Sequence, residues 1–190
     1  MIYIVVGIFG FIVVHLFDIV SLKRIPSGVK PLTWILGSGL LGYSFIMMSL
    51  APDKLLLPLW STWLGWGLLL LSAFLLVYSL FINLPFRKTY IATGVSDKLI
   101  TTGLYALVRH PWIHWFILIL LSLILVSRSS LLLIAAPIFI LLNILLVVIQ
   151  DKFFFGRMFA EYDRYRKKTP MLIPNRKSIN ACVRTLKTRA

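Results

Sequence analysis

Apolar residues fill five long stretches of this chain, and short polar segments separate them. Each stretch holds few charges and is close to the length of about 20 residues that a helix needs to cross a bilayer. Proline, glycine and basic residues gather in the segments between the stretches, where helices end. The pattern predicts an all-α polytopic membrane protein with about five transmembrane helices, at residues 2–22, 32–50, 58–82, 112–126 and 131–149.

The composition agrees with this prediction. Hydrophobic residues make up 59% of the 190 residues and charged residues 14%, whereas a soluble domain is about 45–50% apolar and about 25% charged. This balance excludes a water-soluble fold. The first apolar stretch has no basic residue before it and no small-residue cleavage site after it, so we interpret it as a span and not as a signal peptide. We expect residues 1–174 to form a single membrane domain.

The basic residues are distributed unevenly between the two ends of the predicted helices. With five spans, 18 of the 20 lysines and arginines lie on one side, and only Lys54 and Arg128 lie on the other. Because basic loops stay in the cytoplasm, we expect loop 83–111 and the C-terminal tail to be cytoplasmic. These flanks account for the net charge of +14, so membrane lipids and not nucleic acid are the expected partners. No feature indicates an obligate protein partner.

The chain changes character after residue 149. Aromatic and basic residues alternate at three- and four-residue steps up to Thr169-Pro170, which predicts one amphipathic helix on the cytoplasmic side. Residues 175–190 are rich in basic residues and are expected to form a mobile tail. The tail holds the single cysteine, Cys182, so an internal disulfide and a cysteine metal cluster are excluded, and no metal site is expected.

Two ionisable residues, His15 and Asp18, lie inside the first span and on one helix face. Ionisable residues inside a membrane are candidates for function. We favour a buried polar pair here, with Asp18 meeting Lys23 or Arg24 at the end of the span.

Two polar segments carry the candidate chemistry. The first, residues 99–111, ends in Arg109-His110-Pro111, and the second begins at Gln150-Asp151. If spans four and five form a hairpin, His110 at the start of one and Asp151 at the end of the other are neighbours. Arginine and histidine at a membrane interface can bind an anion or a polar ligand, and proline suits a first helical turn. The alternative is an interfacial anchor in which these residues pair with an acid.

The stretch Gly103-x-Tyr105-x-x-Val108-Arg109-His110-Pro111 resembles the signature of the isoprenylcysteine carboxyl methyltransferase and phospholipid methyltransferase superfamily. The pattern continues through a hairpin and an acidic pair to two tyrosines and a Leu-Ile-Pro ending. Here Gln150-Asp151, Tyr162 with Tyr165, and Leu172-Ile173-Pro174 stand in that order, so the resemblance covers residues 97–174.

The resemblance implies an integral membrane enzyme that uses S-adenosylmethionine and methylates a lipophilic acceptor, either a carboxylate or an amine. It implies catalytic roles for His110, Arg109 and Asp151. It also implies that the cofactor is bound at the cytoplasmic face by Gly103, Tyr105, Val108, His110, Pro111, Gln150, Asp151, Tyr162, Leu172 and Pro174. An amine acceptor must lose a proton, for which His110 or His114 is suited.

Two departures from the pattern keep alternatives open. Trp112-Ile113-His114-Trp115 stands where the family has x-Tyr-x-Gly, and Gln150-Asp151 replaces a pair of glutamates. The acceptor is therefore not fixed by the resemblance. One alternative is a non-catalytic membrane protein with the same fold. Another is a sterol-reductase-like enzyme that uses NADPH, because such enzymes share an Arg-His-Pro pattern.

Overall fold

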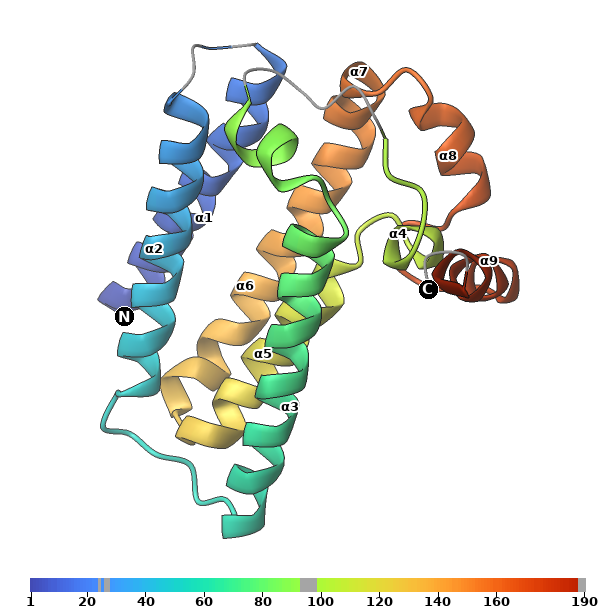
Figure 1. The fold of residues 1–190 in the computed structure, drawn as a ribbon. Helices are drawn as coiled ribbons and strands as arrows, with labels where there is room; N and C mark the ends of the chain where they lie inside the picture. The colour runs from blue at the N-terminus through green and yellow to red at the C-terminus, as the bar shows by residue number, and fades with distance from the viewer. Residues whose placement is uncertain (24, 26–27, 93–98, 188–190) are drawn as a thin grey trace.

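The computed structural model describes residues 1–23, 25, 28–92 and 99–187. Five apolar helices stand side by side in it (Figure 1): α1 (Ile2–Leu22), α2 (Val29–Ser49), α3 (Leu59–Val77), α5 (Trp112–Ser127) and α6 (Ser130–Ile149). The described part of the chain holds helices and no strand, which confirms the all-α prediction. Arg24, the first two residues of the region of resemblance (97–98) and the last three residues of the predicted tail (188–190) lie outside the described residues.

The helices follow the predicted spans closely. The first has the predicted bounds, and α3 continues as the π-helix η1 (Tyr78–Ile82) to the predicted end. The last runs further than expected, because α6 continues through the π-helix η3 (Gln150–Phe154) and α7 (Phe155–Met158). Among the described residues, four helices are long and apolar enough to cross a membrane, whereas α5 has 16 residues.

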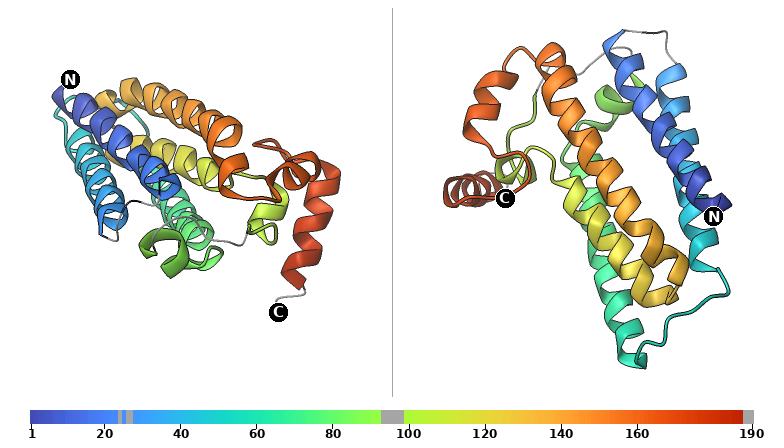
Figure 2. Two further views of the ribbon diagram at one scale, coloured as in Figure 1. Left: turned by 90° about the horizontal axis from the view of Figure 1, so that it is seen from above. Right: turned by 180° about the vertical axis from the view of Figure 1, so that it is seen from behind.

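Helices α1 and α2 form an antiparallel pair whose backbones approach closely. A Cβ atom on Gly37 would lie 2.6 Å from the backbone nitrogen of Val14 and 2.9 Å from the carbonyl oxygen of Gly10. Only glycine allows this approach, which is a common way for helices to pack in a membrane. Helix α3 packs against α5, and α6 lies between that pair and α1 (Figure 2).

A two-residue turn joins α5 to α6 and makes them a tight hairpin, as predicted. Arg128 adopts a left-handed conformation, with φ of 54°, and ends α5. Ser129 then caps α6, because its hydroxyl oxygen accepts a hydrogen bond from the backbone nitrogen of Leu132 at 3.2 Å. The same hydroxyl donates to the carbonyl of Met48 at 2.6 Å, which holds the hairpin against α2.

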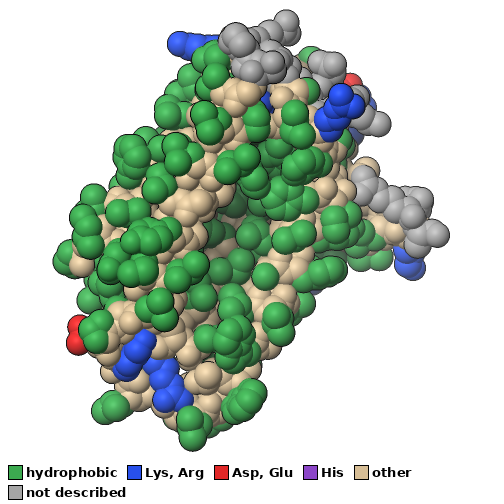
Figure 3. Space-filling model, turned by 60° about the vertical axis from the view of Figure 1, so that its left-hand side comes forward, with side chains coloured by type: hydrophobic (Ala, Val, Ile, Leu, Met, Phe, Trp, Pro, Cys, Tyr) green, Lys and Arg blue, Asp and Glu red, His purple; other side chains and the backbone are tan. Residues whose placement is uncertain are grey.

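The surface of the bundle is apolar, as a bilayer requires. Hydrophobic side chains cover the face in Figure 3, and Lys and Arg side chains gather near its two ends. Buried side chains of α1, α2, α5 and α6 form the core, among them Phe11, Met48, Leu120 and Phe139. The chain is therefore a multi-pass integral membrane protein.

The C-terminal part differs from the prediction in two ways. One amphipathic helix from Gln150 to Thr169 was expected, but the chain bends at Phe159, which is extended, and resumes as α8 (Tyr162–Lys168). A mobile tail was expected after residue 174, whereas Arg176–Lys187 form helix α9. Ser178 and Cys182 on one face of α9 are buried, and α9 packs on α4 (Leu104–Leu107), so tertiary contacts order this basic segment.

Candidate functional site

The two sequence blocks that carry the resemblance lie side by side, although about 60 positions separate them. Val108 is extended, and Arg109 and His110 donate backbone hydrogen bonds to the carbonyls of Pro170 and Met171, at 2.9 and 3.3 Å. Pro111 then turns the chain into α5. This short extended pairing joins the segment before α5 to the segment after α8.

Arg109 and Asp151 form a buried ion pair at the centre of this arrangement. The guanidinium donates through Nε to Oδ1 at 2.7 Å and through Nη2 to Oδ2 at 2.9 Å. Its Nη1 donates to the carbonyls of Arg166 and Thr169, at 3.1 and 2.6 Å. Such bidentate geometry is the strong form of this contact. Every nitrogen of the Arg109 guanidinium is thus used to join η3, α8 and the segment before α5.

Three tyrosines complete the network through their hydroxyl groups. Tyr162 donates to Oδ1 of Asp151, Tyr165 to the carbonyl of Tyr105 at 2.6 Å, and Tyr105 to the carbonyl of Ser79 at 3.3 Å. Burial raises the pKa of each hydroxyl well above 10, and the carboxylate of Asp151 adds to this for Tyr162. All three therefore remain protonated hydrogen-bond donors at neutral pH.

His110 is the polar group in this network that keeps an unused atom. Its ring stacks on Phe155, with centroids 5.4 Å apart and planes 15° apart. Its Nε2 lies 3.6 Å from Oδ1 of Asp151, an electrostatic contact that is too long for a hydrogen bond, and has no hydrogen-bond partner among the described residues. Burial lowers the pKa of His110 more than Asp151 raises it, so the imidazole is neutral at pH 7.

Gly103, Val108 and Pro111 shape the backbone near His110 and offer no polar side chain to the site. Gly103 has φ of +64°, and a Cβ atom there would lie 2.8 Å from Oδ1 of Asn83. Its nitrogen donates to the hydroxyl of Thr185 in α9 at 3.0 Å. Val108 and Pro111 are fully buried.

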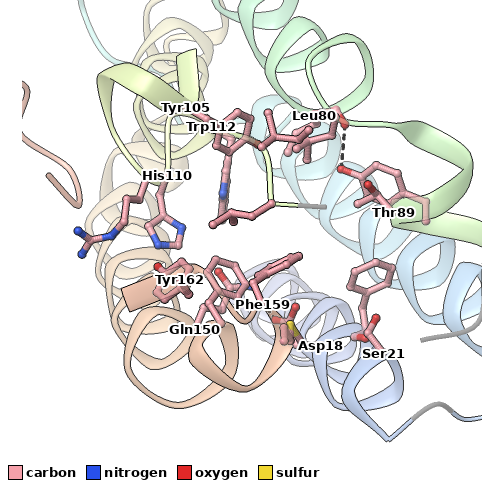
Figure 4. Close-up of a pocket in the computed structure, with 18 of the residues that line it drawn as sticks. Asp18, Ser21, Leu80, Thr89, Tyr105, His110, Trp112, Gln150, Phe159 and Tyr162 are labelled. Atoms are coloured by element: carbon pink, nitrogen blue, oxygen red, sulfur yellow. Dashed lines mark hydrogen bonds between the residues drawn. The ribbon is translucent and has the colours of Figure 1, made fainter. Parts of the chain in front are cut away.

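A cavity of about 260 Å³ opens beside His110. Figure 4 shows Tyr105 and Trp112 facing Phe159 and Gln150 across this space, with Asp18 further along. The walls come from α1, α2, α6, η3, α7 and α8, from residues 80–90, which include part of η2 (Arg87–Ile91), and from residues 99–112, which include α4. Most of the lining residues are apolar or aromatic.

The predicted site residues divide into two groups. Tyr105, Arg109, His110, Gln150 and Tyr162 line the cavity. The others do not: Gly103, Val108, Pro111 and Asp151 support the wall from behind, while Leu172 is half-buried and Pro174 exposed.

The structure also brings residues to the cavity that the sequence interpretation missed. Asp18 was expected to meet Lys23 or Arg24, but Nε2 of Gln150 donates to its Oδ2 at 2.7 Å. Phe155 and Phe159 were not among the predicted site residues, yet they line the cavity. His114, proposed as a second base, does not line it, and its Nδ1 lies 3.3 Å from the carbonyl of Pro111.

Comparison with known proteins identifies the family. The family model named phospholipid methyltransferase matches residues 60–161, more than half of the chain. The chain belongs to this family of membrane methyltransferases. The match includes Arg109, His110 and Asp151 and ends just before Tyr162. No curated protein and no solved structure matches the chain.

Proposed function

We propose that this protein transfers a methyl group from S-adenosylmethionine to a lipophilic acceptor in the membrane, and that the cavity beside His110 is the reaction site. The family supplies the reaction class. The unused Nε2 of His110, buried in the cavity wall, is the observation that carries the assignment.

The residues present fit the cofactor. Besides Nε2 of His110, the Oε1 atom of Gln150 is buried without a partner among the described residues. A nucleoside bearing hydroxyl and amino groups would satisfy both atoms. Aromatic side chains line the cavity around them, and aromatic faces attract a cation such as a sulfonium. Bound there, S-adenosylmethionine would supply an electrophilic methyl group.

The chain contributes position and proton transfer. Holding a nucleophile in line with the methyl carbon lowers the barrier by several kcal/mol. A carboxylate acceptor needs no base, whereas an amine must lose a proton to become or remain nucleophilic. Because His110 is neutral at pH 7, one nitrogen of its ring is unprotonated and can accept that proton.

Arg109 and Asp151 act as positioning residues in this proposal. Each is fully engaged with protein groups, so their pair fixes the backbone that presents His110 and the ring of Tyr162. This differs from the catalytic roles that the resemblance implies for them.

The cavity lies where α1 and α6 end and α2 begins, at the end of the bundle that we assign to the cytoplasm by the positive-inside rule. In Figure 1, η2 and α8 lie toward that end, and α4 and α9 lie beside the start of α5. A soluble cofactor would enter there, while an apolar acceptor would enter from the bilayer.

The test is calorimetric binding of S-adenosylhomocysteine to the detergent-purified protein. We expect binding by the wild type, loss of binding in His110→Ala, and retained binding in His114→Ala, which alters a nearby histidine outside the cavity. Circular dichroism should show the same helix content for all three. Folded wild-type protein that does not bind would contradict the proposal and favour a non-catalytic role, and displacement by NADPH would favour a reductase.

A further inference from the structure

A second hollow, a groove of about 290 Å³, lies between α1 and α6. Its lining is apolar except for His15, Asp18 and Gln150. Ile12 on α1 and Leu145 on α6 line it and are 55% and 56% exposed, so the groove opens on the surface that faces lipid. Hydrocarbon chains of the bilayer are therefore its natural neighbours.

The groove and the cavity meet at one place. His15, Asp18, Leu146 and Gln150 line both. Gln150 of η3 reaches α1 by donating to Asp18, so this hydrogen bond stands between the bilayer and the cavity. Both ring nitrogens of His15 are buried and without a partner among the described residues. The inner end of this apolar groove is thus polar, and some of its polar atoms have no hydrogen-bond partner among the described residues.

We propose that this groove holds the hydrocarbon chain of the lipid acceptor, and that Asp18, Gln150 and His15 hold the polar head where groove and cavity join. The inference rests on the proposed function, since it takes the cavity as the reaction site. It also names the class of ligand for this site, which is an amphiphile with a long chain and a polar head that donates hydrogen bonds.

The groove and its polar inner end have different roles, because their walls differ in chemistry. An apolar wall offers a hydrocarbon chain little that lipid does not already offer, so the groove orients the chain and adds little affinity. Selectivity for the head group then comes from the place where groove and cavity join, which we call the junction and which His15, Asp18 and Gln150 line. The carboxylate of Asp18 accepts hydrogen bonds and repels a second carboxylate, so it favours an amine or hydroxyl head.

Lys30 is the nearby basic group, and it is held on the cavity side. It lines the cavity but not the groove, its Nζ donates to the carbonyl of Ala92 at 3.2 Å, and it lies 5.1 Å from the centre of the Phe17 ring. A head at the junction therefore meets Asp18 and Gln150 before it meets Lys30.

Photolabelling in proteoliposomes tests the groove. The probe is a long-chain primary alkylamine with a diazirine on its chain, and mass spectrometry locates the adducts. We expect adducts on α1 and α6 that excess unlabelled alkylamine suppresses. Leu145→Trp, which fills the groove, should lower this labelling about tenfold. Leu141→Trp is the control, because Leu141 lies one turn away, is 66% exposed and does not line the groove.

A carboxylate exchange tests the junction. The wild type should label more with the alkylamine than with the matched fatty acid, and Asp18→Asn should remove that preference. The double variant Asp18→Asn/Gln150→Glu, which moves the carboxylate from α1 to η3, should restore it. Equal labelling of Leu145→Trp and Leu141→Trp, or a preference unchanged by Asp18→Asn, would overturn the inference. Binding of S-adenosylhomocysteine, measured on the wild type and on Leu145→Trp, reports separately on the proposed function, because Leu145 does not line the cavity.

Discussion

Arg109 and Asp151 are 42 positions apart in the sequence and meet in a buried, bidentate ion pair. The pair joins the segment before α5 to the end of α6, and Arg109 also reaches the carbonyl of Thr169 beyond α8. One guanidinium therefore organises all three parts of the wall beside His110.

Removing one partner of this pair should destabilise the protein strongly. Asp151→Asn leaves the charge of Arg109 buried without its counter-ion, and breaking such a pair costs about 3–5 kcal/mol. We expect a clear fall in the thermal unfolding midpoint in detergent, followed by circular dichroism. Asp163→Asn is the control, because Asp163 is exposed on α8. Equal midpoints for the two variants would show that the pair does not hold the fold.

The neutral state of His110 predicts a pH dependence of stability. Burial lowers its pKa below the ordinary value of 6.5, so between the two values the unfolded chain binds a proton that the folded protein does not. Stability from this residue is therefore complete above about pH 6.5 and decreases as pH falls toward the folded pKa. The unfolding midpoint of the wild type should drop more between about pH 7.5 and about pH 5 than that of His110→Gln. Parallel curves would contradict the assignment of a neutral, buried imidazole.

Gly103 should resist substitution because of its backbone. With φ of +64° and the side chain of Asn83 2.8 Å from the site of a Cβ atom, Gly103→Ala is strained twice. Such backbone strain costs about 1–3 kcal/mol. We expect a lower unfolding midpoint than for Gly156→Ala, since Gly156 has ordinary φ and no neighbour within 4 Å of its Cβ position. A variant as stable as this control would refute the strain argument.

The sequence allowed the spans and the neighbourhood of His110 and Asp151 to be predicted, because both follow from local patterns. Hydrophobic length gave α1 its bounds, and the tight α5–α6 hairpin required the two residues to be close. The bond between Asp18 and Gln150 was missed because 132 positions separate them, and no local pattern pairs residues at such a distance.

The misjudged C-terminal region has a similar cause. The residues of α7 and α8 were interpreted as one amphipathic helix because aromatic and basic side chains alternate there. The chain is instead extended at Phe159, and this break brings Phe155 and Phe159 into the cavity wall beside the predicted Tyr162. The basic composition of Arg176–Lys187 also hid the small residues Ser178 and Cys182, which pack inward.

Because residues 176–187 form the helix α9, we predict that Cys182, the single cysteine of the chain, reacts slowly with thiol reagents. Its side chain is 7% exposed, and burial raises the pKa of its thiol, so both access and thiolate fraction are low. Maleimide should react with it at least about tenfold more slowly than with a cysteine at position 180 in an Asn180→Cys/Cys182→Ala variant, because reaction at Cys182 requires local opening of α9. Asn180 is exposed on the same helix, so chain position and local charge are matched. In denaturant the two rates should converge. Equal rates in the folded protein would mean that residues 176–187 are a mobile tail after all, and that the contact of Thr185 with Gly103 does not persist in solution.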